Sequence, residues 1–173
     1  MKDQISEHRL AREGFLFYPL TRDQYRERIS GSDHFWVAER DGKIVAYCMA
    51  YTFAELGSFT FLTDNDHSVL DYFRSWGCEP GCVYFAQAAT ILSHEARGAM
   101  AELAVCLPKY AVERGVPAIL CEISLQPRND ASLAAANRTG FRMVATRTKN
   151  NPAEKKDRVS GTFMRILEDK AWR

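Results

Sequence analysis

The chain has 173 residues, of which 46% are hydrophobic and 26% are charged, and its formal net charge is +1. This length and composition are typical of a soluble globular protein, and we expect a single domain over residues 1–173. The near-neutral charge gives no electrostatic reason to expect nucleic acid or an anionic membrane as a partner, and the apolar runs are too short to span a bilayer.

The N-terminal stretch and the cysteines predict a reducing, cytoplasmic location. "MKDQISEHRLAREG" is too charged to be a secretory signal. The five cysteines are an odd number, which argues against a disulfide framework. The one close pair, in "CEPGC" (78–82), has no second Cys/His pair to complete a tetrahedral site, so we expect a turn there and no metal.

The first half of the chain is predicted to alternate strands and helices. "GFLFYPL" (Gly14–Leu20) is apolar and aromatic, which favours a strand, and "TRDQYRERIS" follows as a helix with Thr21 as its N-cap. The stretch His34–Tyr51 holds two β-rich runs around Asp41-Gly42, a dipeptide typical of tight hairpins. "TFAELGSFTFLTDND" is irregular and aromatic and is interpreted as a loop.

The middle of the chain is predicted to contain the central strand and a long helix. Asp66–Gly77 has apolar residues at helical spacing and ends in glycine. Cys82–Leu92 is a mostly apolar run suited to a buried central strand. Gly98–Arg114 repeats apolar residues every three or four positions, which indicates a helix, and Pro108 is expected to kink it.

The last third is predicted to hold three strands and one helix. Pro117–Leu125 is the next strand, and "NDASLAAANRTG" is a helix capped near Asn129 or Asp130 and closed by Gly140. "FRMVATRTK" and "VSGTFMRIL" are strands around a basic loop, "NNPAEKKDR". The resulting order, βαββαβαβαββ, predicts an α/β (α+β) fold: a mixed, mostly antiparallel sheet with a parallel pair in its second half and helices on both faces.

This order, combined with three local motifs, resembles the GNAT superfamily of acetyl-CoA-dependent N-acetyltransferases, and small bacterial members in particular. In that family a central strand, here containing Tyr84–Gln87, leads into a loop of the form Arg/Gln-x-x-Gly-x-Gly/Ala that starts a helix. The matching residues are Glu95–Met100. The following strand carries Cys121-Glu122, and the next helix lies in "NDASLAAANRTGF". The resemblance covers roughly residues 14 to 167.

The resemblance implies acetyl-CoA as co-substrate, with no metal. A helix N-terminus carries unpaired N–H groups and a partial positive charge that attract a pyrophosphate, and small residues let the backbone approach it closely. In the family, the pantetheine arm lies against the central strand. The implied cofactor-binding residues are Ala89, Thr90, Ala96, Arg97, Gly98, Ala99, Met100, Ala101, Asn129 and Ser132.

Two residues of the loop depart from the family pattern. Glu95 stands where the family has a residue that hydrogen-bonds phosphate, and Met100 stands where it has a small one. If Glu95 points outward it is a favourable first-turn carboxylate, whereas pointing at the pyrophosphate it would weaken binding. The Met100 side chain is flexible enough to turn away. We interpret the loop as compromised rather than abolished.

The catalytic residues also depart from the family pattern. Many members use a carboxylate on the central strand as base, but "YFAQAAT" has none, and Ala86 stands where close relatives have Asp. Ala136 occupies the place where others have Tyr or His. The candidates left are Glu122, a carboxylate in mid-strand that must be paired or have a raised pKa, and Gln87, which would orient substrate or water. Structural roles for both stay open: an ion or backbone partner for Glu122, and packing for Gln87.

The leading hypothesis is an enzyme, an N-acetyltransferase. It would move an acetyl group from acetyl-CoA to an amine of a small molecule or peptide by direct attack. The alternative is a catalytically impaired GNAT-fold binding or regulatory protein, which the combined departures at Glu95, Met100, Ala86 and Ala136 favour. Nucleic-acid binding by the basic loop is a third hypothesis, opposed by the two acidic residues in that loop. A homodimer is left open.

Overall fold

The computed structural model describes residues 20–75, 77, 81–151 and 156–167. Within these residues no helix is both long enough and apolar enough to cross a membrane. The elements in chain order are α2 (Arg22–Ser30), β1 (Phe35–Arg40), β2 (Lys43–Thr52), α3 (Phe53–Ser58), α4 (Asp64–Ser75), β3 (Val83–Thr90), the 3-10 turn η1 (His94–Ala96), α5 (Ala99–Glu113), β4 (Ala118–Gln126), α6 (Asp130–Arg138), β5 (Arg142–Asn151) and β6 (Lys156–Ile166).

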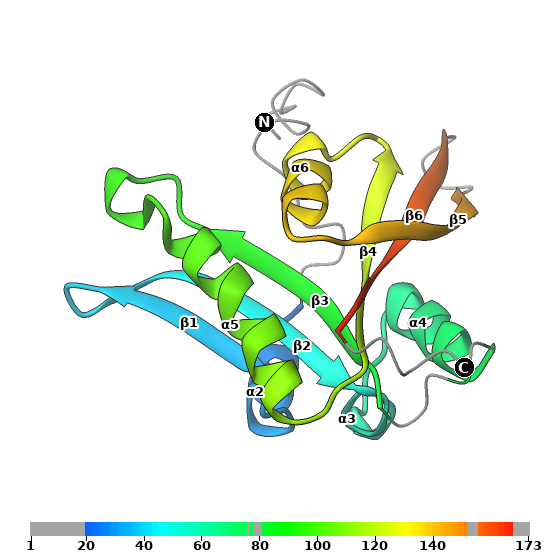
Figure 1. Ribbon diagram of the computed structural model, residues 1–173, viewed down its shortest axis with the longest axis horizontal. Helices are drawn as coiled ribbons and strands as arrows, with labels where there is room; N and C mark the ends of the chain where they lie inside the picture. The colour runs from blue at the N-terminus through cyan, green and yellow to red at the C-terminus, as the bar shows by residue number, and fades with distance from the viewer. Residues whose placement is uncertain (1–19, 76, 78–80, 152–155, 168–173) are drawn as a thin grey trace. The chain divides into compact units, whose positions relative to one another are not determined.

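The strands form a six-stranded sheet in the order β1-β2-β3-β4-β6-β5 (Figure 1). The pairs β1–β2, β2–β3 and β5–β6 are antiparallel, and β3–β4 is the parallel pair. This confirms the predicted mixed, mostly antiparallel sheet with a parallel pair in its second half. Hydrophobic periodicity and turn residues therefore identified the fold class.

The described residues fall into two compact units. The larger one contains residues 20–120 with 166–167, and the smaller one contains 121–151 with 156–165. Strand β4 therefore begins in the larger unit and ends in the smaller one. The expectation of a single domain over the whole chain stays a prediction.

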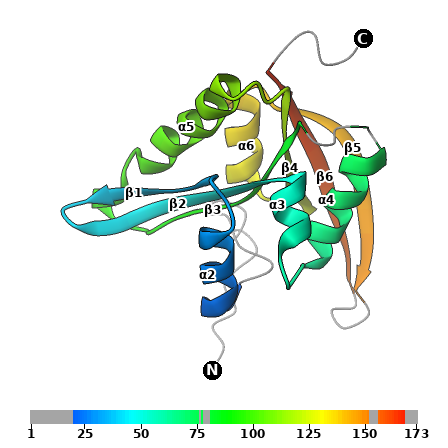
Figure 2. The ribbon, with the colours of Figure 1, turned by 90° about the horizontal axis from the view of Figure 1, so that it is seen from below.

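In the larger unit, helices cover both faces of β1, β2 and β3. Helix α5 lies on one face, and α2 lies on the opposite face, with α3 and α4 on that same side (Figure 2). Under α5 the core is a cluster of small and aliphatic side chains, which we call the α5-face core. Its buried members are Ala38, Val45, Ala46, Cys48, Ala96, Ala99 and Leu103.

Local signals explain the start of α2 and the β1–β2 hairpin. Thr21 is the N-cap of α2, and it exchanges hydrogen bonds with Gln24 in a capping box. Asp41 and Gly42 adopt positive φ angles of 50° and 74°, as a two-residue hairpin turn requires. Both predictions are confirmed.

One predicted loop is wrong. The stretch read as irregular, "TFAELGSFTFLTDND", contains helix α3 and the start of α4. Thr52 caps α3: its hydroxyl accepts from the Glu55 N–H at 3.2 Å, and its own N–H donates to the Glu55 carboxylate at 2.6 Å. The Thr-x-x-Glu spacing of a capping box was present in the sequence. The aromatic residues around it obscured that signal.

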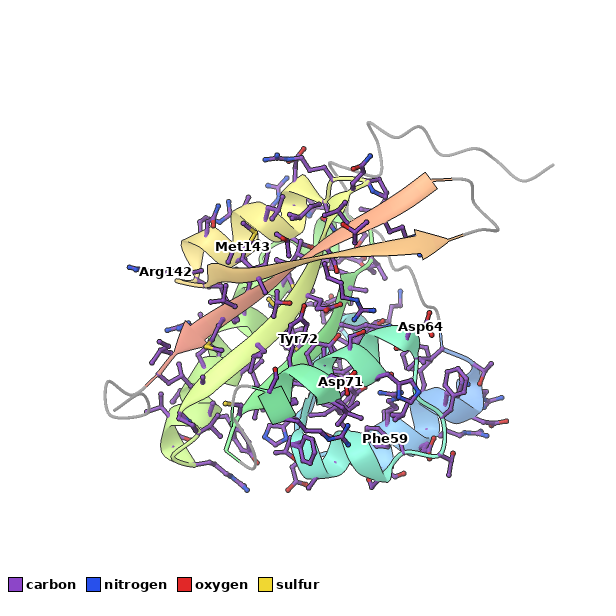
Figure 3. The ribbon with its side chains drawn as sticks, turned by 90° about the vertical axis from the view of Figure 1, so that its right-hand side faces the viewer. Phe59, Asp64, Asp71, Tyr72, Arg142 and Met143 are labelled. Atoms are coloured by element: carbon purple, nitrogen blue, oxygen red, sulfur yellow. The ribbon has the colours of Figure 1, made fainter. Side chains whose placement is uncertain are left out.

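A buried cation joins α2 to the segment before α4. Arg28 is 2% exposed, and its Nη2 donates to the Asp66 carboxylate at 2.9 Å and to the Phe61 carbonyl at 2.8 Å. Its guanidinium lies 4.6 Å from the ring centroid of Phe59, at the end of α3 (Figure 3 labels Phe59), and 5.1 Å from that of Tyr51. Burial opposes the charge, but the Asp66 carboxylate outweighs it, so the pKa of Arg28 is raised above its ordinary value.

The smaller unit matches its predicted elements. Asn129 is the N-cap of α6, and Gly140 follows the helix with a φ of 82°. The hairpin of β5 and β6 has little room for a side chain at Gly161, where a Cβ would lie 2.8 Å from the Phe163 ring and 3.1 Å from the Met143 sulfur (Figure 3 labels Met143). The strands also extend into the predicted basic loop, since β5 reaches Asn151 and β6 begins at Lys156.

Some predictions cannot be compared with the structure. Most of the predicted strand Gly14–Leu20 and the cysteine Cys78 lie outside the described residues. Pro108 lies inside α5 as expected, while the kink it should cause stays a prediction.

Candidate functional site

The N-terminus of α5 has the backbone geometry of an anion-binding site. Gly98 is the N-cap, with φ 82° and ψ −16°, and no side chain caps the helix there. The first backbone bond of the helix runs from the Glu102 N–H to the Gly98 carbonyl at 3.1 Å. The N–H groups of residues 98–101 therefore have no acceptor within the helix. Nothing lies within 4 Å of where a Cβ would stand on Gly98, which leaves room for close approach.

The small residues around Gly98 serve the core as well as the loop. Ala96 is 7% exposed and Ala99 is fully buried, and both belong to the α5-face core. The half-buried Met100 packs against that core, so its side chain does not fill the space beside Gly98. Ala101 is exposed. Of the two departures from the family loop, the one at Met100 therefore has a packing explanation.

Three charged side chains surround this helix start. Glu95 and Arg97 are both exposed, so each is free to turn toward or away from a bound anion. Glu102, in the first turn of α5, is held by Arg40 of β1, whose Nη2 lies 2.6 Å from both carboxylate oxygens. This ion pair screens an acidic group close to the anion site. Sequence analysis missed it because the two residues are 62 positions apart.

Ala89 and Thr90 end strand β3 in regular register with β2. Their partners are Tyr47 and Ala46, and the Thr90 hydroxyl donates to the Val45 carbonyl at 3.1 Å. The Thr90 side chain is thus committed to the sheet. A role for this position in binding pantetheine would fall to the backbone.

A β-bulge lies upstream on the same strand. The β2 partners of Phe85 and Gln87 are consecutive residues, so Ala86 is an extra residue in β3. On a regular strand, residues two apart share a face. Here Phe85 packs against the α5-face core, whereas Gln87 reaches Tyr25 of α2 on the opposite face. The bulge therefore turns Gln87 toward α2.

Gln87 belongs to a cluster of three polar side chains that sequence analysis did not assemble. Its Oε1 accepts from the hydroxyls of Tyr25 and Tyr47, each at 3.2 Å, and the two hydroxyl oxygens lie 3.1 Å apart. All three side chains are half-buried. Burial, followed by the bond with Tyr25, raises the pKa of Tyr47, so this phenol stays protonated at neutral pH. We call this group the tyrosine cluster.

The second predicted catalytic residue lies in the smaller unit. Glu122 is half-buried in β4, between the buried residues Cys121 and Ile123. Burial, with a contribution from the Glu122 charge, raises the pKa of the Cys121 thiol to about 12. A thiol with that pKa is protonated at neutral pH and makes a poor nucleophile. Cys121 therefore fits the packing role expected of it.

Asn129 and Ser132 meet at the start of α6. Asn129 is 6% exposed, and its Oδ1 accepts from the Ser132 backbone N–H at 3.0 Å. The amide oxygen is therefore used as a helix cap. Ala136, two turns into the helix, is 6% exposed and supplies no group for proton transfer, as predicted from the sequence.

His94 and His34 form no catalytic arrangement at the start of α5. His94 is exposed in η1. His34 is 5% exposed, and its Nδ1 lies 3.2 Å from Glu55. Burial opposes the Glu55 charge, but hydrogen bonds from His34, Thr52 and Asp33 outweigh it and lower the pKa of Glu55 to about 2. Among the described residues, no three Cys, His, Asp or Glu side chains are grouped to hold a metal ion.

Comparison with known protein families matches residues 3–141 to the acetyltransferase (GNAT) family. The chain belongs to this family. The match covers most of the chain, including the loop before α5 and the helix after β4, so it confirms the resemblance identified from the motifs. It also confirms the expected class of enzyme, the acyltransferases. A comparison with curated proteins finds no match.

Solved GNAT-like structures share the fold at low sequence identity. A Salmonella typhimurium protein described as an acetyltransferase, solved with its cofactor acetyl-CoA, is 16% identical, with a TM-score of 0.57 over 85% of this chain and 72% of its own. A ribosomal-protein-alanine N-acetyltransferase from Brucella melitensis is 20% identical, with a TM-score of 0.58 over 84% and 76%. A polyamine N-acetyltransferase of Drosophila melanogaster is 13% identical, with a TM-score of 0.62 over 90% and 86%. These neighbours differ in the amine they are named for, so the shared fold does not fix the acceptor.

Proposed function

We propose that this GNAT-family chain is an N-acetyltransferase that moves an acetyl group from acetyl-CoA to an amine of a small molecule or peptide by direct attack. The start of α5 is the observation that carries the proposal. There, backbone N–H groups without acceptors in the helix surround a glycine with open space beside it. That arrangement suits a pyrophosphate, and CoA carries one.

The chain's own residues fit acetyl-CoA in a specific way. Backbone N–H groups of residues 98–101 would bind the pyrophosphate with help from the dipole of α5, and exposed Arg97 would pair with it. The backbone at Ala89 and Thr90 would face the pantetheine arm. Asn129 and Ser132 complete the proposed binding set in the smaller unit. Acetyl-CoA supplies an activated acetyl group as a thioester.

The reaction needs little from side chains beyond positioning. A neutral amine attacks the carbonyl carbon, the C–N bond forms, and the C–S bond breaks. The amine proton leaves to water or a nearby base, and the CoA thiolate takes up a proton. We assign Gln87 to orienting the amine or a water molecule and Glu122 to accepting the proton. Orientation alone accounts for a large part of the acceleration in such bimolecular reactions.

The first test is the shift in thermal unfolding with acetyl-CoA, with CoA and ATP as controls. At a hundred times Kd, binding should stabilise the protein by about 2.7 kcal/mol, which is roughly 5–10 °C for a chain of this size. Shifts with acetyl-CoA and CoA, and none with ATP, would support the proposed site. No shift at millimolar acetyl-CoA would overturn it.

The two charged residues of the loop, Arg97 and Glu95, should affect acetyl-CoA affinity in opposite directions. Arg97→Gln should weaken acetyl-CoA binding by roughly two- to fivefold, and Glu95→Gln should strengthen it by a similar factor, because exposed charge pairs contribute up to about 1 kcal/mol. Lys109→Gln is the matched control: it removes an exposed charge about 15 Å away along the same helix. Equal effects from all three variants would contradict binding at this loop.

Turnover separates the enzyme from its alternative. With a panel of amines, release of free CoA thiol should depend on both acetyl-CoA and the amine, and Glu122→Gln should reduce kcat. Tight acetyl-CoA binding with no thiol release for any amine would instead support a binding or regulatory protein, as the alanines at 86 and 136 suggest.

A further inference from the structure

The tyrosine cluster is short of hydrogen-bond donors. Three oxygens, from Tyr25, Tyr47 and Gln87, lie 3.1 to 3.2 Å from one another. The two phenols bring only two hydrogens to these three contacts, so at any moment one contact has no hydrogen. The separations also exceed the usual 2.7–2.8 Å of O–H···O bonds. The two phenol oxygens are therefore loosely bonded and can accept further N–H donors.

The same count makes the cluster a poor site for an anion. Both phenol hydrogens are directed at the Gln87 oxygen or at the other phenol. A carboxylate or carbonyl could bind only by breaking one of these bonds. Because the pKa of Tyr47 is raised, its oxygen acts as a neutral acceptor and not as a phenolate.

The surroundings of the cluster suit an amine. The ring of Phe35 stacks on Tyr47, with centroids 5.7 Å apart and an interplanar angle of 3°, and Tyr25 meets Tyr47 edge-on at 6.1 Å. Electron-rich aromatic rings attract cations. These three rings and Gln87 are half-buried, so each side chain keeps part of its surface exposed.

The cluster also lies close to Ala89, whose backbone is proposed to face the pantetheine arm. Gln87 follows the bulge at Ala86, and Ala89 is two residues further along the strand. At about 3.3 Å per residue, the Cα atoms of Gln87 and Ala89 are roughly 7 Å apart. A group held by the phenols would therefore lie within one small-molecule length of that arm.

We propose that the tyrosine cluster is the acceptor site, and that it selects primary amines with no carboxylate beside the amino group. The inference rests on the proposed acetyl transfer and names its substrate class. After the ammonium form releases one proton to water, two N–H groups of the neutral amine donate to the phenol oxygens of Tyr25 and Tyr47. The nitrogen lone pair then points away from the cluster, as attack on a thioester requires.

Matched pairs of amines test this selectivity. Tyramine, agmatine and histamine each differ from tyrosine, arginine and histidine by one carboxylate. In each pair the amine should have a kcat/KM at least tenfold higher than the amino acid. Equal values, or a preference for the amino acids, would overturn the inference.

Phenol deletions test the residues. Tyr25→Phe and Tyr47→Phe keep the rings and remove the oxygens, so each should raise the KM for the amine about tenfold and leave the Kd of acetyl-CoA unchanged. Tyr110→Phe is the control, because Tyr110 lies on α5, on the other face of the sheet, where its ring packs against His34 and Trp36. If the two cluster variants behave like Tyr110→Phe, the cluster is structural.

Calorimetric titration of the protein alone with agmatine separates this inference from the proposed function. Agmatine binding that Tyr47→Phe weakens at least fivefold, in a protein that does not bind acetyl-CoA, would sustain the acceptor site and reject acetyl transfer. Acetyl-CoA binding together with agmatine binding that is absent, or indifferent to both phenol deletions, would reject the acceptor site alone.

Discussion

Helix α2 contributes one residue to each of two polar clusters, Arg28 to the first and Tyr25 to the second. The two clusters differ in burial and in charge. Arg28 is 2% exposed, and its Nη2 binds both a carboxylate and a carbonyl. Tyr25 belongs to a half-buried group whose three oxygens share two phenol hydrogens. The first cluster is buried and charge-balanced, while the second is half-buried and its two phenols supply fewer hydrogens than the group has contacts.

The difference separates groups that hold the fold together from groups able to bind something else. A buried charge without its partner costs several kcal/mol, so the buried pair Arg28–Asp66 fixes α2 against the first turn of α4. The hydrogen bonds of the half-buried tyrosine cluster are long, so they contribute little to the free energy of unfolding. Of these two clusters, the one with acceptor capacity left for a ligand is the tyrosine cluster, at its two phenol oxygens.

The largest effect is expected from breaking the buried pair. Arg28→Met leaves the Asp66 carboxylate buried without its cation, and it should lower the free energy of unfolding by about 3–5 kcal/mol, or roughly 10 °C in Tm. Arg26→Met on the same helix is the control, since Arg26 pairs only with exposed Asp23 and should cost under about 1 kcal/mol. Equal losses, measured by urea unfolding, would show that burial is not the cause.

The half-buried carboxylate of Glu55 predicts a dependence of stability on pH. The pKa of Glu55 in the folded protein is about 2, below its ordinary value of 4.5, so its contribution is complete above pH 4.5 and is lost as the pH falls toward 2. Glu55→Gln should therefore cost on the order of 2–3 kcal/mol at pH 7 and much less at pH 3. Denaturant unfolding of both proteins at the two pH values measures this. A cost that does not change with pH would contradict the ionic role of Glu55.

The smallest loss of stability is expected from removing the phenol hydroxyls of the tyrosine cluster. Tyr25→Phe and Tyr47→Phe each remove a loosely held hydroxyl, so each should change the free energy of unfolding by no more than about 1 kcal/mol. Because the hydroxyls share one acceptor, the double variant should cost less than the sum of the single ones. A loss near that of Arg28→Met would mean that the tyrosine cluster, too, serves mainly to hold the fold.

Local chemistry made much of the fold predictable. The Asp41-Gly42 turn, the Thr21 cap and the Gly140 stop each act within a few residues, so the sequence reveals them directly. The family loop was recognisable for the same reason, since its residues are consecutive. Helix α3 was missed although its capping box is equally local. That miss came from giving more weight to aromatic composition than to spacing.

The tyrosine cluster could not be predicted in the same way. Its pairs are separated by 22, 40 and 62 residues, and only the packing of α2 on the sheet brings them together. The residues predicted as a site, from Gln87 to Ser132, stay predictions, because their roles depend on ligands. Glu122 and Gln87 were selected for their chemistry alone, and for Gln87 the structure adds partners from α2 and β2.

The bulge at Ala86 has an evolutionary consequence. One extra residue reverses which side chains of β3 face α2 and which face α5. Insertion or deletion of a single codon at this place would thus exchange the side chain presented to the acceptor without altering the order of strands in the sheet. A lineage could therefore acquire a new substrate by a one-residue shift that changes which side chains of β3 face α2, with no substitution in the core.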